Sequence, residues 1–173
     1  MAEQPTAVLP PPRERPYRVG LVCLGNICRS PMAAAVLDRK LRDAGLADRV
    51  EVSSAGTGDW HVGEPMDRRA AATLVAAGYD SGGHRAQQVS PGWLDRDLLL
   101  TMDATNRADV LALRVAPERV LPFRAFDPAA GDCADDLEVP DPWYGGPDGF
   151  EGVLTIVERT SGSLAHALSD LLG

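Results

Sequence analysis

Residues 22–31 read Val22-Cys23-Leu24-Gly25-Asn26-Ile27-Cys28-Arg29-Ser30-Pro31. The apolar residues 19–22 that lead into this stretch predict a buried strand, and the Ala-rich residues 33–37 that follow it predict a helix. A tight loop between a strand and a helix N-terminus directs several backbone N–H groups at one point, where an anion can bind. The stretch therefore predicts a phosphate-binding loop, residues 24–30, between the first strand and the first helix.

Two side chains of this loop region are suited to phosphate chemistry. Cys23 stands at the entrance and can attack phosphorus, and Arg29 stands at the exit and can hold two phosphate oxygens in a planar fork. A thiol attacks as its thiolate, a form that a helix N-terminus and a neighbouring Arg stabilise. Gly25 permits backbone angles that a side chain would forbid. The alternative, a buried structural Cys beside a surface Arg, is disfavoured because the motif is complete in its strand–turn–helix context.

Strand and helix patterns alternate along the rest of the chain. Strands are expected at residues 17–23, 50–53, 98–101 and 119–122, and helices at residues 31–44, 67–77, 103–113 and 150–172. This alternation predicts an α/β fold: a single domain with a four-stranded parallel sheet and helices on both faces, in a flavodoxin-like three-layer sandwich. Ligands of such sheets bind beyond the C-terminal ends of the strands, and Cys23 is expected there.

Length and cysteine content indicate one independent domain. A chain of 173 residues can bury a core that needs neither disulfides nor metals for its stability. Its three cysteines form an odd set without framework spacing, which fits a reducing compartment. No segment is long and apolar enough for a secretory signal or a membrane span. We therefore expect a cytoplasmic protein.

The first 16 residues differ from the rest of the chain. Five of them are proline, namely Pro5, Pro10, Pro11, Pro12 and Pro16, and proline excludes a helix interior or a central strand. We expect residues 1–16 to form a proline-rich flexible extension and residues 17–173 to form the domain.

The charge of the chain restricts its partners. A formal net charge of −8 argues against nucleic-acid binding. The same charge repels a phosphorylated substrate at long range, so the mouth of the site must be locally positive. Salt screens the global charge beyond ~8 Å, whereas the loop dipoles and Arg29 act at contact. Much of the acid lies in residues 127–141, which we expect to form a solvated loop.

The loop sequence resembles the signature of the low molecular weight protein tyrosine phosphatases of bacterial type. Further strings resemble the same family in the same order: Thr57-Gly58-Asp59-Trp60-His61-Val62-Gly63, His84-Arg85-Ala86, Met102-Asp103-Ala104-Thr105-Asn106 and Asp141-Pro142-Trp143-Tyr144-Gly145. The resemblance spans about residues 17–172. It implies the same flavodoxin-like fold and hydrolysis of a phosphotyrosine-containing protein substrate through a cysteinyl-phosphate intermediate, with no cofactor and no metal.

The resemblance also implies roles for residues outside the loop. Asp141 stands at the position of the family's general acid, which protonates the leaving alcohol and contributes ~10²–10⁴-fold. By itself, an Asp-Pro pair is more typical of a turn. His84 and Asp103 stand where the family has supports of the phosphate-binding loop. Their residue types alone fit a satisfied polar residue or a helix cap equally well.

Three aromatic residues are candidates for the walls of a substrate slot. Trp60, Trp143 and Tyr144 could flank a flat ring and so favour phosphotyrosine over the shorter phosphoserine. Two residues depart from the common family pattern. Trp143 stands where Tyr is frequent, and Gln87 stands where the common His-x-Ala-Arg string has Arg, which removes an outer salt bridge.

The remaining loop residues are predicted to organise it. Asn26 can hold a left-handed turn, and the Ser30 hydroxyl can donate to the Cys23 thiolate, cap the helix, or do both. Cys28 is a redox candidate, because it could capture an oxidised Cys23 as a disulfide before over-oxidation. The alternative is that Cys28 only packs under the loop as a small apolar residue.

Two other functions fit parts of this pattern. A thiol-dependent arsenate reductase shares the loop and the fold, but it needs further cysteines to relay a disulfide. Cys28 and Cys133 are present, yet no Cys pair occurs in the middle of the chain. A catalytically inactive phosphotyrosine-binding module should have lost Cys23, Arg29 or Asp141, and all three are present. The sequence therefore predicts an active phosphatase.

Overall fold

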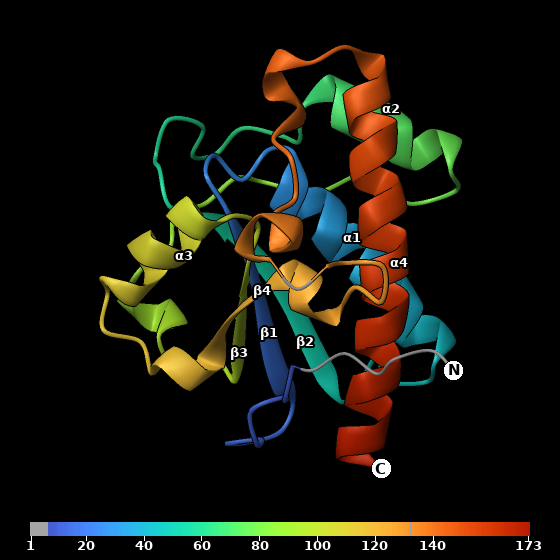
Figure 1. The fold of residues 1–173 in the computed structure, drawn as a ribbon. Coiled ribbons are helices and arrows are strands. Elements are labelled where there is room, and N and C mark those ends of the chain that lie inside the picture. The colour runs from blue at the N-terminus through green and yellow to red at the C-terminus, as the bar shows by residue number, and fades with distance from the viewer. Residues whose placement is uncertain (1–6, 132) are drawn as a thin grey trace.

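The computed structural model describes residues 7–131 and 133–173. Its centre is a parallel sheet of four strands, β1 (Tyr17–Cys23), β2 (Val50–Gly56), β3 (Leu98–Thr101) and β4 (Val120–Pro122), in the order β2-β1-β3-β4 (Figure 1). The parallel sheet and the flavodoxin-like order predicted from the alternating pattern are confirmed.

Helices cover both faces of the sheet. They are α1 (Arg29–Asp43), α2 (Arg68–Ala76), α3 (Ala104–Leu111) and α4 (Pro147–Leu172). In Figure 1, α1 and α4 lie on one side of the strands and α3 lies on the other. The strands alternate accordingly: Val19 and Leu21 belong to the large core cluster with α1 and α4, whereas Val22 belongs to a smaller cluster with Val110 of α3.

The second strand is longer than its apolar pattern predicts. Residues 54–56 continue β2 beyond the predicted end at Ser53, because Ser54, Ala55 and Gly56 pair in register with the last three residues of β1. The pair Ser53-Ser54 does not by itself predict a strand, and its extended conformation here results from pairing with β1. As a result, β2 ends beside Cys23, at the edge of the sheet where the phosphate-binding loop begins.

Part of the proline-rich segment contacts the amino ends of the strands. Pro10 accepts a hydrogen bond from the Tyr17 hydroxyl at 2.8 Å, and the Arg13 amide donates to Asp97 at 2.7 Å. The Asp97 carboxylate is buried just before β3 and also accepts from the Arg18 amide at 2.7 Å. The flexibility predicted for residues 1–16 stays a prediction, and residues 1–6 lie outside the described residues.

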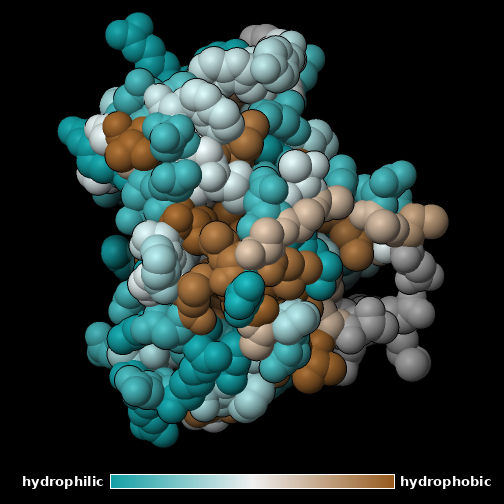
Figure 2. All heavy atoms as spheres, turned by 90° about the vertical axis from the view of Figure 1, so that its left-hand side faces the viewer, coloured by the Kyte–Doolittle hydropathy of each residue, from teal (hydrophilic) through white to brown (hydrophobic). Residues whose placement is uncertain are grey.

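Figure 2 views the molecule from the side that carries α3. Hydrophobic residues gather near the middle of this face, and hydrophilic residues surround them. Leu113, which follows α3, is 42% exposed. Over residues 7–131 and 133–173, no helix combines the length and the apolar character needed to cross a membrane.

Candidate active site

The side chain of Asn26, a residue of the phosphate-binding loop, anchors the loop to neighbouring segments. This buried residue has a φ of 59°, the left-handed conformation that the sequence predicted. Its side-chain nitrogen, Nδ2, donates to the hydroxyls of Ser30 and Ser54, both at 2.9 Å. Its side-chain oxygen, Oδ1, accepts from the Gln87 backbone amide at 3.0 Å. Three different segments thus fix one turn of the loop.

The Cys23 sulfur lies at the end of β1 with two polar neighbours. The Ser30 hydroxyl oxygen is 2.9 Å from it, and the Asn26 amide donates to it at 3.3 Å. Ser30 is the second residue of α1 and does not cap the helix, because Cys28 occupies the N-cap position without a side-chain cap. The hydroxyl is closer to the sulfur, at 2.9 Å, than to the Ala55 carbonyl oxygen, at 3.4 Å, and a hydroxyl that donates to the sulfur stabilises a thiolate.

Arg29 is buried and connects the loops that follow three different strands. Its Nη1 donates to the Asp103 carboxylate at 2.7 Å and to the Val139 carbonyl at 3.1 Å. Its Nη2 lies 3.5 Å from the carboxylate of Asp141. The Arg29 side chain is 4% exposed, and these contacts fix the orientation of its guanidinium before any ligand arrives.

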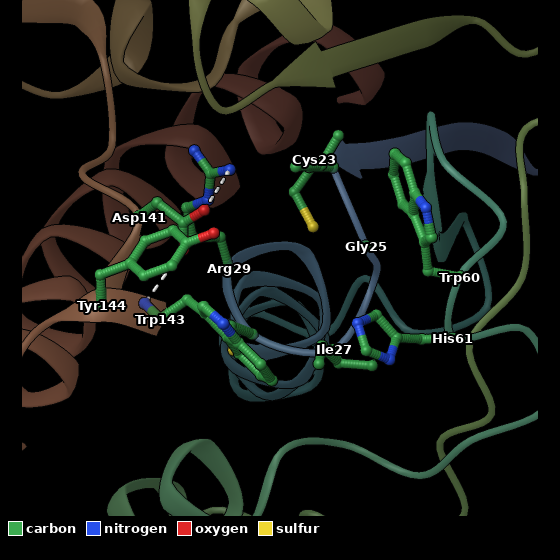
Figure 3. A pocket seen from close by; sticks show the side chains of 11 residues that line it. Cys23, Gly25, Ile27, Arg29, Trp60, His61, Asp141, Trp143 and Tyr144 are labelled. Atoms are coloured by element: carbon green, nitrogen blue, oxygen red, sulfur yellow. Dashed lines mark hydrogen bonds and ion pairs between the residues drawn. The ribbon is translucent and has the colours of Figure 1, made fainter.

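Asp141 begins the short 3₁₀ turn Pro142–Tyr144 that leads to α4. Its Oδ1 accepts a hydrogen bond from the Trp143 amide at 3.1 Å, and its side chain remains 36% exposed. Asp141, far from Cys23 and Arg29 in the sequence, is brought together with them at one cavity (Figure 3). A thiol, a guanidinium and a carboxyl group therefore face the same space.

The cavity has a volume of about 300 Å³ and mostly apolar walls. It is lined by Cys23, Leu24, Gly25, Ile27, Cys28, Arg29, Trp60, His61, Asp141, Trp143 and Tyr144. Figure 3 shows Trp60 and His61 on one side of Cys23, and Trp143 and Tyr144 on the other. The three aromatic residues proposed from the sequence all line this slot.

His61 is a wall residue that the sequence analysis missed. Its ring lies 5.8 Å from that of Trp143, tilted by 50°, and its Nδ1 is 2.7 Å from the Glu64 carboxylate. A Cβ on Gly25 would lie 3.0 Å from the His61 ring. Gly25 therefore allows the close approach of His61, and the adjacent Trp60 was the signal that could have identified it.

The ring of His84 supports the phosphate-binding loop by a hydrogen bond to the loop backbone. Its Nε2 lies 2.7 Å from the Asn26 carbonyl oxygen. Burial lowers the pKa of His84, so the ring is neutral near pH 7 and its Nε2–H donates to the carbonyl. Gln87, which replaces the common Arg, donates to the Ser54 carbonyl at 3.0 Å. A neutral hydrogen bond therefore stands where the family pattern implied a salt bridge.

Cys28 lines the cavity beneath the loop. Burial, with the nearby charges of Asp67, Cys23 and Asp141, raises the pKa of the Cys28 thiol to about 12. It therefore remains a protonated thiol near neutral pH. Of the three cysteines, only Cys133 is exposed, and none is in a disulfide.

The acidic loop before Asp141 is anchored rather than fully solvated. Asp127 was expected at the surface, but its side chain is buried and receives hydrogen bonds from Arg159 at 2.6 and 2.8 Å and from Arg124 at 3.0 Å. Burial opposes ionisation, but these hydrogen bonds, led by that of Arg159, hold the pKa of Asp127 below its ordinary value. Arg124 also donates to the Glu138 carbonyl at 3.1 Å, which fixes the loop just before Asp141.

Comparisons with known proteins agree over nearly the whole chain. The family described as low molecular weight phosphotyrosine protein phosphatase matches residues 18–171. A low molecular weight protein-tyrosine-phosphatase from Streptomyces coelicolor is 47% identical over 161 residues, covering 89% of this chain and 94% of that protein. Low molecular weight protein-tyrosine phosphatase A from Mycobacterium tuberculosis is 47% identical over 143 residues, covering 83% of this chain and 86% of that protein.

Solved structures share the fold. YfkJ from Bacillus subtilis matches with a TM-score of 0.82 at 31% identity, covering 91% of this chain and 98% of that chain. A protein tyrosine phosphatase from Entamoeba histolytica, crystallised with Hepes in its active site, matches with a TM-score of 0.81 at 29% identity, covering 88% and 97%.

Proposed function

This chain belongs to the low molecular weight phosphotyrosine protein phosphatase family and is a protein-tyrosine phosphatase, and we propose that Cys23, Arg29 and Asp141 perform its chemistry. The observation that carries the assignment is their convergence on one cavity, with Arg29 3.5 Å from Asp141. Cys23 is the nucleophile, Arg29 clamps the phosphoryl oxygens, and Asp141 is the general acid.

In the first step, the Cys23 thiolate attacks the phosphorus of phosphotyrosine. The bond between phosphorus and the phenolic oxygen breaks, and Asp141 gives its proton to the departing oxygen. The Arg29 guanidinium and backbone N–H groups of the phosphate-binding loop hold the equatorial oxygens. The guanidinium is already held by Asp103 and the Val139 carbonyl, so the step gains electrostatic stabilisation with little reorganisation of this group.

In the second step, water attacks the phosphorus of the cysteinyl-phosphate. Asp141, now a carboxylate, takes the proton from that water, and the bond between sulfur and phosphorus breaks. Inorganic phosphate leaves, and the Cys23 thiolate re-forms beside the Ser30 hydroxyl, 2.9 Å away.

The aromatic walls of the cavity favour a phosphotyrosine side chain of a protein as the substrate. The rings of Trp60, Trp143 and Tyr144 flank the approach to Cys23, so a phenyl ring can stack while its phosphate reaches the loop. Tyr144 is 92% exposed and Trp60 is 68% exposed, so both are also within reach of the polypeptide around the phosphotyrosine. The free thiols agree with a cytoplasmic location, which we include in the proposal.

Replacing Asp141 with Asn tests the general-acid role. We expect kcat/KM on phenyl phosphate to fall by about 10²-fold, because the phenolate then leaves without a proton. Esters of strongly acidic phenols need little protonation and should lose far less. The measurement is kcat/KM across a series of aryl phosphates. An equal loss along the whole series would remove Asp141 from this role.

Cys28 is proposed to protect Cys23 from over-oxidation. Peroxide converts the Cys23 thiolate to a sulfenic acid, and attack by the Cys28 sulfur would form a disulfide and release water. Burial raises the pKa of the Cys28 thiol to about 12, so its reactive thiolate fraction grows with pH and this capture should become faster as the pH rises.

Peroxide should therefore inactivate the wild type reversibly, and phosphate should protect it. The Cys28→Ser variant should recover less activity after dithiothreitol treatment, and the difference between the two proteins should grow as the pH rises. Equal recovery of both proteins at every pH would leave Cys28 as a packing residue only.

A further inference from the structure

Arg69, the second residue of α2, is held at a fixed point beside the cavity. Asp67, the residue before α2, caps the helix by accepting from the Arg69 amide at 2.8 Å. The same carboxylate receives Nε and Nη2 of the Arg69 side chain, both at 3.2 Å, in a two-pronged ion pair. The position of the guanidinium is therefore set by the start of the helix.

The other side of this guanidinium faces the loop that carries Asp141. Its Nη1 donates to the Trp143 carbonyl at 3.3 Å. Its central carbon lies 5.3 Å from the centre of the Trp143 ring and 4.7 Å from that of Phe150, which is buried in α4. Arg69 thus contacts the Asp141 loop through one hydrogen bond and one cation–π contact, both with Trp143, and contacts α4 through a second cation–π contact with Phe150.

The contacts form a chain between the two halves of the site. The Asp67 amide donates to the carbonyl of Ile27, within the phosphate-binding loop, at 2.9 Å. Arg69 then joins Asp67 to the Trp143 carbonyl, and the Trp143 amide donates to the Asp141 carboxylate at 3.1 Å. One side chain therefore connects the loop that binds phosphate to the residue that donates the proton.

We propose that Arg69 is a positioning residue that holds the general acid Asp141 in register with the phosphate-binding loop. The inference rests on the proposed role of Asp141. Arg69 does not line the cavity and does not touch the reacting atoms, so it acts through the Trp143 peptide. Trp143 is also a wall of the slot, so the same contact sets the position of the ring-binding surface.

The role requires a planar, multidentate cation. A guanidinium can donate to Asp67 and to the Trp143 carbonyl at once while its faces contact two rings. A lysine ammonium is a single point and keeps only part of these contacts. A glutamine keeps neither the charge nor the geometry.

The experiment compares Arg69→Gln and Arg69→Lys with Arg68→Gln. Arg68 is the exposed neighbour on the same helix, so its substitution makes the same change in net charge without disturbing these contacts. We expect Arg69→Gln to lower kcat/KM on phenyl phosphate about tenfold, on esters of strongly acidic phenols less than about twofold, and Arg69→Lys to lie between. The Arg68→Gln control should match the wild type across the series.

Two further measurements separate positioning from general damage. Inhibition by inorganic phosphate should be unchanged in Arg69→Gln, because the loop itself remains intact. In an Asp141→Asn background, Arg69→Gln should add no further dependence on the leaving group, because the group that it positions is gone.

A uniform loss across the aryl phosphates, or a loss matched by Arg68→Gln, would overturn the proposal. So would a full additional effect in the Asp141→Asn background. If Asp141→Asn alone shows no dependence on the leaving group, it is the general-acid assignment that fails. The two failures are therefore distinguishable.

Discussion

Replacing Cys23 with Ser should lower kcat/KM by about 10⁵-fold or more, close to the loss seen when a catalytic nucleophile is removed from other enzymes. A serine hydroxyl is almost entirely protonated near neutral pH, so it is a far weaker nucleophile than a thiolate. The Ser30 hydroxyl and the Asn26 amide are placed to stabilise an anion on sulfur rather than to accept a proton. Initial rates with p-nitrophenyl phosphate provide the measurement.

The matched control is Cys133→Ser, because Cys133 is exposed and does not line the cavity. Its activity should equal that of the wild type. The Cys23→Ser protein should still bind inorganic phosphate, since Arg29 and the loop amides remain. Turnover within about tenfold of the wild type would exclude Cys23 as the nucleophile.

The Arg29→Lys substitution should lower kcat/KM by about 10³-fold, because an ammonium cannot reproduce the planar fork on two phosphate oxygens. Arg29 also donates to Asp103 and to the Val139 carbonyl, and a lysine cannot hold both while facing the ligand. Inhibition by inorganic phosphate should weaken in parallel, which locates the defect in anion binding.

Arg39→Lys is the control for this substitution. Arg39 lies on the same helix, and its side chain is 54% exposed, so its replacement should leave the rate unchanged. A wild-type affinity for phosphate in Arg29→Lys would contradict the clamp role even if the rate fell.

The fold could be predicted because its signals are local. Apolar runs such as Leu98–Thr101 and the cap residue Asp103 specify their elements without reference to the rest of the chain. The end of β2 could not be predicted in this way, since Ser54 is in a strand only through its pairing with Leu21. The burial of Asp127 likewise depends on Arg159, a partner 32 residues away.

The site likewise contains residues that local motifs predict and residues that only contacts across the fold reveal. Cys23 and Arg29 belong to one contiguous motif, and Asp141 was found through a second motif that resembles the same family. The contribution of His61 and Arg69 arises from contacts across the fold, with Trp143 in both cases. No spacing in the sequence encodes these contacts.

The docking of residues 10–13 bears on how this protein can be attached to a solid support. These residues contact the amino ends of the strands, and exposed Glu14 borders a hollow there with Arg49 and Leu172. Cys23 lies at the opposite end of the seven-residue strand β1, about 20 Å away at the usual rise per residue. A bead or an electrode coupled through Glu14 would therefore leave the catalytic mouth open to solution, and the attached enzyme should keep the kcat/KM that it has in solution.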